Sequence, residues 1–361
     1  MKYHIVTYGC QMNKSDSERI ATILENKGYQ PASNINEADL IVVNMCSVRQ
    51  SAVDRVFGLI PKFEKLKKEN PNLKTILTGC ILKKDRPKFA KGFDQILKFK
   101  DLLRCQPKYQ NNFMAFIPIS NGCNNFCSYC VVPFVRGPLV CRDHKEILEE
   151  VKNVVEKGFK EIWLLGQNVN SYGVPRETDA KFTPTPNLGV GASTKQTRNI
   201  NFAKLLKMVN DIPGEFQIRF TSPHPADFSD ELIETMAKCE KVAKFLNLPV
   251  QSGDNEILKR MNRPYTVEQY KNLVKKIRKK IPDINLSTDV IVGFPGETKK
   301  QFENTAKLFK EIKFNIAYIA KYSPRSGTAA FKMKNDVPLE EKKRRENLLR
   351  EIIKLRSSVD Y

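Results

Sequence analysis

The chain has 361 residues, which is enough to bury a large core and to form two or three domains. A total of 61 Lys and Arg against 40 Asp and Glu gives a formal net charge of +21, which favours a polyanionic partner such as RNA or DNA. No apolar run approaches the length of a membrane span and the N-terminus begins with a strand pattern, so we expect a cytoplasmic protein without membrane contact.

Strand and helix patterns alternate through the first hundred residues. Short apolar runs occur at 5–8, 40–43 and 75–77, with helical patterns from 13 to 28 and from 51 to 68. This alternation predicts a parallel sheet in which all strand C-termini lie along one edge. A cysteine follows each run, and these are Cys10, Cys46 and Cys80. We expect the three to converge as ligands of a shared metal site, with three unrelated buried cysteines as the alternative.

A loop at 121–130 carries three further thiols at C-x3-C-x2-C spacing, after an apolar run at 115–119. They are Cys123, Cys127 and Cys130. Three thiolates on a [4Fe-4S] cluster leave one iron open, where S-adenosylmethionine (SAM) can bind and be cleaved to a radical by one electron. Structural zinc is the competing interpretation. Its ligands would be Cys127, Cys130, Cys141 and His144.

The chain from 115 to 322 predicts an incomplete (β/α)6 barrel. Apolar runs lie at 115–119, 161–165, 216–220, 244–250, 284–292 and 316–322, and helical patterns at 144–157, 202–210, 230–238, 266–280 and 299–310. Functional residues of such barrels lie at strand C-termini, so we expect a cofactor pocket there. The candidates are Gly166, Gln167, Asn168, Gln251, Asp289 and Gly293. Asp289 lies within an apolar run, where a carboxylate needs a partner.

These patterns divide the chain into an N-terminal domain at 1–108, a barrel domain at 109–335 and a C-terminal linker helix within 336–361. Residues 174–200 lack periodicity and are predicted to form a surface loop, and a charged amphipathic pattern at 340–356 predicts the helix. The stretch at 61–108 has 14 Lys or Arg against 5 Asp or Glu, which suits contact with phosphates. Cys105 and Cys239 lie away from any strand end and are interpreted as structural.

Seven motifs, in this order, closely resemble the radical SAM methylthiotransferases of the MiaB type over nearly the whole chain. They are TYGCQMN at 7–13, NMCSVR at 44–49, GC at 79–80, CNNFCSYCVVP at 123–133, LLGQNVNSY at 164–172, LPVQSG at 248–253 and DVIVGFPGET at 289–298. An ordered set is far more specific than any single cysteine motif.

The resemblance implies methylthiolation of C2 of N6-isopentenyladenosine next to the tRNA anticodon. It implies two [4Fe-4S] clusters, with Cys123, Cys127 and Cys130 holding the one that cleaves SAM, and Cys10, Cys46 and Cys80 holding an auxiliary cluster that carries the sulfur. The partners would be tRNA, SAM, and an electron donor and a sulfur source that the sequence does not identify. On this basis the zinc interpretation is set aside.

Two features depart from the family pattern. The family tends to have Ser where Cys141 stands and an acidic residue where Leu139 stands. It also continues into a β-barrel RNA-binding domain, TRAM, after the linker helix, so we expect that domain to be missing or cut off here. The rival functions are methylthiolation of threonylcarbamoyladenosine in tRNA or of an Asp of a ribosomal protein, and a metal-stabilised RNA-binding module without turnover.

Overall fold

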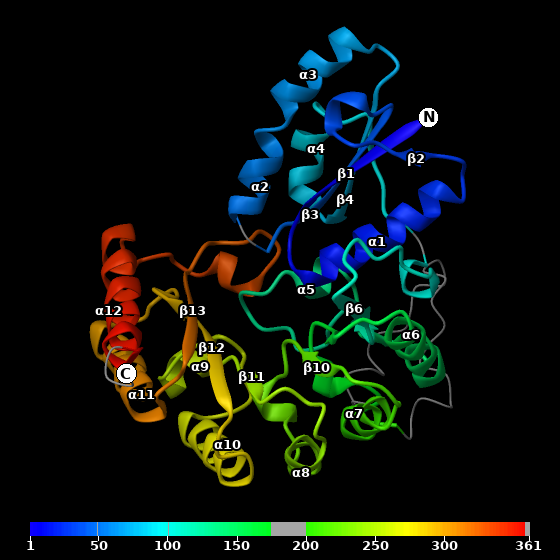
Figure 1. The fold of residues 1–361 in the computed structure, drawn as a ribbon. Helices are drawn as coiled ribbons and strands as arrows, with labels where there is room; N and C mark the ends of the chain where they lie inside the picture. Colours follow the sequence, from blue (N-terminus) through cyan, green and yellow to red (C-terminus); the bar gives the residue numbers. More distant parts are fainter. Residues whose placement is uncertain (49, 100, 175–199, 358–361) are drawn as a thin grey trace. The chain divides into compact units, whose positions relative to one another are not determined.

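The computed structural model describes residues 1–48, 50–99, 101–174 and 200–357 (Figure 1). Within these residues the backbone divides into two compact units. Unit 1 comprises Met1–Asn124 and Val131–Leu165, and unit 2 comprises Asn125–Cys130 and most of the chain from residue 166 onward. The surface loop predicted at 174–200 lies outside the described residues except for its two ends. The predicted domain boundaries at 108 and 335 stay a prediction.

Unit 1 contains a five-stranded parallel sheet in the order β2-β1-β3-β4-β5. Its strands are β1 (Lys2–Tyr8), β2 (Gln30–Pro31), β3 (Leu40–Cys46), β4 (Lys74–Cys80) and β5 (Gln95–Ile96). Every residue of the central strand β3 is buried, because a parallel sheet is covered on both faces. The predicted parallel sheet is thereby confirmed.

Helices cover both faces of this sheet. They are α1 (Gln11–Glu25), α2 (Gln50–Phe57), α3 (Ile60–Glu69) and α4 (Arg86–Phe89). Ile41 and Val43 of β3 belong to a core shared with α2, α3 and α4, whereas Val42 packs with Ile20 of α1. The single helix predicted at 51–68 is wrong. The helical pattern is interrupted at Gly58 and Leu59, because Pro61 has no backbone N–H to donate to the carbonyl of Phe57 four residues earlier.

The remainder of unit 1 consists of two pairs of strands and two helices. The strands β6 (Met114–Pro118) and β9 (Glu161–Leu165) pair in parallel, and β7 (Ser120–Asn121) and β8 (Val140–Cys141) pair antiparallel. The helices are α5 (Val132–Val135) and α6 (His144–Glu156).

A buried ion cluster joins α1 to α6. Glu150 of α6 accepts hydrogen bonds from Arg19 at 2.8 Å and from Arg142 at 2.7 Å. Tyr109 also donates to Glu150, at 2.8 Å. Arg19 is completely buried, so its charge depends on this carboxylate. The cluster therefore fixes α1, and with it Cys10 at the start of that helix, against α6.

We expect Glu150→Ala to lower the free energy of unfolding by about 3–5 kcal/mol, because it leaves two buried guanidinium groups without their shared anion. Urea unfolding followed by circular dichroism measures the change. The matched control is Asp283→Ala in the exposed pair of Lys244 and Asp283, which should leave the midpoint unchanged. Equal midpoints for the two variants would contradict the importance of the cluster.

Glu18 of α1 is buried beside this cluster, and burial raises the pKa of its carboxyl to about 7 from an ordinary value of 4.5. The folded state therefore holds this proton more tightly than the unfolded chain. Its contribution to stability is complete below pH 4.5 and is lost as the pH rises through 7. We expect Glu18→Gln to flatten the fall of the urea midpoint between pH 5 and pH 7. Glu64→Gln, at an exposed position of α3, should retain the wild-type profile, and a retained profile in Glu18→Gln would contradict the assignment.

Unit 2 continues the alternation of strands and helices. Its strands are β10 (Gln217–Phe220), β11 (Phe245–Asn247), β12 (Asn285–Val292) and β13 (Ile316–Lys321), of which β11, β12 and β13 form a parallel sheet. Its helices are α7 (Phe202–Asn210), α8 (Asp230–Lys238), α9 (Asn255–Arg260), α10 (Val267–Lys280), α11 (Lys299–Ile312) and α12 (Leu339–Ser357). All of these elements except α9 were predicted, and α12 lies within one residue of the linker helix predicted at 340–356.

Short 3-10 helices occupy several connections. They are Ile35–Glu37, Lys83–Asp85, Leu102–Arg104, Val169–Ser171, Pro225–Asp227 and Ala329–Lys332. In the described part of the chain, no helix is both long enough and apolar enough to cross a membrane.

Candidate active site

Cys10, Cys46 and Cys80 meet at the C-terminal edge of the unit 1 sheet. Cys46 and Cys80 are the last residues of β3 and β4 and lie opposite each other in the strand register. Cys10 is the residue that caps α1, which therefore begins two residues earlier than the helical pattern predicted from residue 13. The hydrogen bond with the Cys80 thiol lowers the pKa of the Cys46 thiol. A negative charge on Cys10 acts in the opposite direction and raises this pKa. Cys46 and Cys80 are buried and Cys10 is exposed, so the site is open on one side.

Two buried asparagines hold this edge together. Asn13 Oδ1 accepts hydrogen bonds from the backbone N–H of Cys10 at 3.2 Å and from its thiol at 3.4 Å. Asn13 Nδ2 donates to Asn44 Oδ1 at 3.1 Å, and Asn44 Nδ2 donates to the Asn13 carbonyl at 2.8 Å. The start of α1 is thereby tied to β3 next to Cys46.

Gly79 allows β4 to approach this network. Its φ is +98°, and a Cβ at this position would lie 2.3 Å from the Met45 carbonyl oxygen and 2.4 Å from Asn44 Oδ1. A larger residue would push Cys80 away from Cys46, which explains a glycine directly before the cysteine.

Arg136 provides a positive charge at the same site, which sequence reasoning missed. Its Nε donates to Cys80 Sγ at 3.1 Å and its Nη2 donates to Asp16 Oδ2 at 2.7 Å. Its Nη1 donates to Asn121 Oδ1 at 2.9 Å. The guanidinium group is thus held in one orientation, with one edge against a thiol. The position of Arg136, six residues after Cys130, was the only signal in the sequence.

The C-x3-C-x2-C loop crosses from unit 1 to unit 2, and we describe its two parts separately. In unit 1, Cys123 donates its backbone N–H to the Gly137 carbonyl at 3.2 Å. In unit 2, the backbone N–H of Cys130 donates to the Cys127 carbonyl at 2.9 Å, and Ser128 bonds through Oγ to the Arg260 carbonyl at 2.8 Å. The three thiols are half-buried, so a bound group could reach them.

A second buried arginine lies against this loop in unit 2. Arg263 Nη1 donates to Cys127 Sγ at 3.5 Å. Its other partners are neutral: Nε donates to Tyr265 Oη at 2.9 Å and Nη2 donates to the Pro249 carbonyl at 3.2 Å. No motif or periodicity in the sequence pointed to Arg263 either.

The residues predicted at strand ends in unit 2 show two signs of a site. Gln251 has a φ of +69°, a left-handed conformation that costs free energy in a non-glycine residue and that often marks a functional site. Asn168 is buried and donates to Asp227 Oδ2 at 2.6 Å, yet its own Oδ1 has no hydrogen-bond partner among the described residues. A buried acceptor of this kind is available to a ligand.

The other predicted residues have local explanations. Asp289 is half-buried, and its Oδ2 accepts from Asn247 Nδ2 at 2.8 Å, which gives the carboxylate the partner expected from its place in an apolar run. Gly293 has a φ of +68°, which a glycine is needed to adopt, and its N–H donates to Glu297 Oε2 at 2.6 Å. Gly166 and Gln167 follow β9 in the chain, the first buried and the second half-buried.

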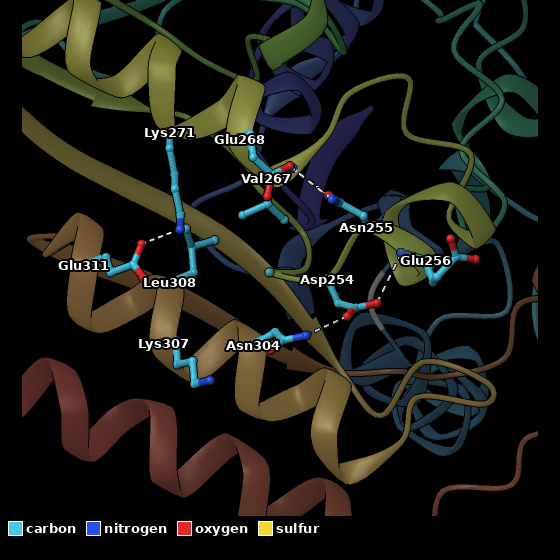
Figure 2. A pocket seen from close by; sticks show the side chains of 11 residues that line it. Asp254, Asn255, Glu256, Val267, Glu268, Lys271, Asn304, Lys307, Leu308 and Glu311 are labelled. Atoms are coloured by element: carbon cyan, nitrogen blue, oxygen red, sulfur yellow. Dashed lines mark hydrogen bonds and ion pairs between the residues drawn. The ribbon is translucent and has the colours of Figure 1, made fainter.

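A cavity of about 310 Å³ lies between α9, α10 and α11 of unit 2 (Figure 2). Its lining side chains pair with one another. Asn304 donates to Asp254 at 2.8 Å, Asn255 donates to Glu268 at 3.0 Å, and Lys271 pairs with Glu311. Apart from the strand-end residue Gly253, this lining contains none of the residues discussed above.

Known proteins resemble this chain over almost its whole length. The Radical SAM superfamily matches residues 117–309, and the Uncharacterized protein family UPF0004 matches residues 2–98. The tRNA-2-methylthio-N(6)-dimethylallyladenosine synthase of Clostridium novyi is 41% identical, over 98% of this chain and 81% of the relative. The chain belongs to the family of these synthases. The synthase of Carboxydothermus hydrogenoformans is 40% identical, over 99% of this chain and 83% of the relative.

Solved radical SAM structures share the fold. The methyltransferase TsrM from Kitasatospora setae, solved with cobalamin and a [4Fe-4S] cluster, has a TM-score of 0.62 at 12% identity and covers 91% of this chain and 77% of its own. The cobalamin-dependent enzyme OxsB has a TM-score of 0.57 at 12% identity and covers 98% of this chain and 56% of its own.

Membership of the synthase family makes the chain a radical SAM methylthiotransferase and confirms the resemblance drawn from the motifs. The family implies SAM and [4Fe-4S] clusters, and the thiols fit clusters. In the described residues no three Cys, His, Asp or Glu side chains are grouped to hold a single metal ion. A [4Fe-4S] cluster does not require its ligands to converge on a single metal ion, because each thiolate binds a different iron.

Proposed function

We propose that this protein adds a methylthio group to C2 of N6-isopentenyladenosine next to the anticodon of tRNA, in the cytoplasm. The observation that carries the proposal is the meeting of Cys10, Cys46 and Cys80 at one sheet edge, in a chain that also has a C-x3-C-x2-C loop. Radical SAM chemistry alone needs only the loop. A second set of three thiols supports a reaction that also transfers sulfur.

The proposed cluster ligands fall into two sets. Cys123, Cys127 and Cys130 would hold the cluster that binds SAM, and Cys10, Cys46 and Cys80 would hold a second [4Fe-4S] cluster. When bound, these groups supply one electron, a radical and the sulfur. In the protein, β3 and β4 present Cys46 and Cys80 side by side, and the asparagine network keeps Cys10 next to them. An electron donor that reduces the clusters and a source of replacement sulfur complete the proposed reaction.

We further propose that SAM is bound at the strand ends of unit 2. The residues are Gly166, Gln167, Asn168, Gln251, Asp289 and Gly293. The support is strongest for Asn168, whose buried Oδ1 has no hydrogen-bond partner in the described part of the chain, and for Gln251, whose backbone is strained.

Mass spectrometry of nucleosides tests the reaction. The reconstituted protein is incubated with dithionite, SAM and tRNA that carries N6-isopentenyladenosine, and the tRNA is then digested. We expect a mass gain of one methylthio group on this nucleoside. A methylthio product on threonylcarbamoyladenosine, or on an Asp of a ribosomal protein offered in parallel, would instead assign a rival substrate. Absence of every product from protein with both clusters loaded would overturn the proposal.

Binding of tRNA is proposed to involve lysines on the exposed side of α3. Lys62, Lys65 and Lys68 are exposed and spaced three residues apart, so they share one helix face. Each phosphate contact contributes roughly −0.7 to −0.9 to the slope of log affinity against log salt concentration. We expect replacement of all three by Gln to make that slope less negative by about 2 to 3, as measured by filter binding.

The matched control replaces three exposed lysines elsewhere, namely Lys275 and Lys279 of α10 and Lys300 of α11. Both triple variants lose the same net charge. If both changed the slope equally, the effect would come from overall charge and the proposed α3 surface would be wrong.

A further inference from the structure

Each set of proposed cluster ligands has one thiol that accepts a hydrogen bond from a buried arginine. In unit 1, Arg136 Nε lies 3.1 Å from Cys80 Sγ, and in unit 2, Arg263 Nη1 lies 3.5 Å from Cys127 Sγ. Both arginines hold their orientation through further hydrogen bonds, to Asn121 in the first case and to Tyr265 in the second. Two units of different architecture thus place the same group against a ligand sulfur.

The two arginines differ in how far a neighbouring carboxylate offsets their positive charge. Arg136 forms an ion pair with Asp16 at 2.7 Å, and the side chains of both are about nine-tenths buried. The carboxylate offsets most of the guanidinium charge that Cys80 experiences. Arg263 is bonded to a tyrosine hydroxyl and to a carbonyl, which carry no charge, and burial raises the pKa of Tyr265. Among the described residues no carboxylate pairs with Arg263, so Cys127 faces a positive charge that is less compensated than the one at Cys80.

We propose that Arg136 and Arg263 are positioning residues that set the reduction potentials of the two clusters, and that Asp16 weakens the influence of Arg136. This inference rests on the proposed ligand sets. Reduction adds one electron to a cluster, taken from the reductant, and makes the cluster and its thiolates more negative. A positive charge and an N–H···S hydrogen bond stabilise that state and raise the potential. The effect should be large at Cys127 and small at Cys80.

Redox titration with dithionite and mediators, followed by electron paramagnetic resonance, measures each potential in isolation. The auxiliary cluster is studied in protein with Cys123, Cys127 and Cys130 replaced by Ala, and the other cluster in protein with Cys10, Cys46 and Cys80 replaced by Ala. Iron content is measured first. If either parent failed to bind its four irons, the ligand assignment would be wrong, independently of the arginines.

In loaded proteins we expect Arg263→Gln to shift its cluster to a clearly more negative potential, and Arg136→Gln to shift the auxiliary cluster by less. Arg263→Lys keeps the charge and should recover part of the shift. Asp16→Asn removes the carboxylate that offsets the charge of Arg136, so it should move the auxiliary cluster to a more positive potential. Because Asp16→Asn leaves Arg136 in place, it tests the inference even where Arg136→Gln fails to fold.

Each arginine is also the control for the other. Arg263→Gln in the auxiliary-only protein should leave the potential unchanged, and Arg136→Gln in the other single-cluster protein should shift the potential by less than Arg263→Gln does there. Unshifted potentials in loaded Arg263→Gln and Asp16→Asn, or equal shifts of both clusters by either arginine variant, would overturn the inference.

Discussion

Replacement of Cys10, Cys46 and Cys80 by Ala is expected to abolish methylthiolation while the cleavage of SAM continues. The open iron of the remaining cluster needs only an electron and SAM, and its proposed ligands Cys123, Cys127 and Cys130 are untouched. Without the second set of thiols there is no cluster to carry sulfur. Chromatography of a single reaction measures both products, deoxyadenosine and the methylthiolated nucleoside.

The chain offers a matched control for this variant. Its other three cysteines outside the proposed ligand sets are Cys105, Cys141 and Cys239. Their replacement by Ala removes the same number of thiols and should leave both products at wild-type levels. Continued methylthiolation after loss of Cys10, Cys46 and Cys80 would show that sulfur arrives by another route, and the proposed role of this set would be abandoned.

The second large effect is expected for Cys127→Ala. It removes one of three thiolates from the cluster that binds SAM, so deoxyadenosine and the methylthiolated nucleoside should both disappear. The iron content should fall by about half, since the proposed ligands of the auxiliary cluster are in unit 1 and remain unchanged. Iron analysis and the absorption spectrum of the reconstituted protein measure this change. A fall to zero would contradict two independent clusters, and no fall would exclude Cys127 as a ligand.

Cys141→Ala is the control for this experiment. Cys141 stands in β8 and was one of the four residues of the zinc interpretation. Its replacement should leave the iron content and both products unchanged. Loss of iron in Cys141→Ala would mean that the loop uses a ligand outside the three proposed here.

Most of the fold followed from local patterns. The apolar runs at 161–165 and 284–292 became β9 and β12 with boundaries within one residue, and α7 and α8 coincide with the helices predicted at 202–210 and 230–238. Hydrophobic periodicity and capping act within a few residues of chain, so they can be read without the fold. Local errors occurred where a single residue interrupts an element, as Pro61 does between α2 and α3.

The position of the cysteines also followed from the sequence, because the topology of a parallel sheet places all strand ends at one edge. What the sequence alone did not predict is which charged side chains complete the site. Arg136 meets Cys80 across 56 residues of chain, Arg263 meets Cys127 across 136, and Arg19 meets Glu150 across 131. No periodicity encodes such contacts. They exist because burial removes water from an arginine and leaves it only the polar groups that packing brings within reach. Which groups these are is decided by the tertiary structure.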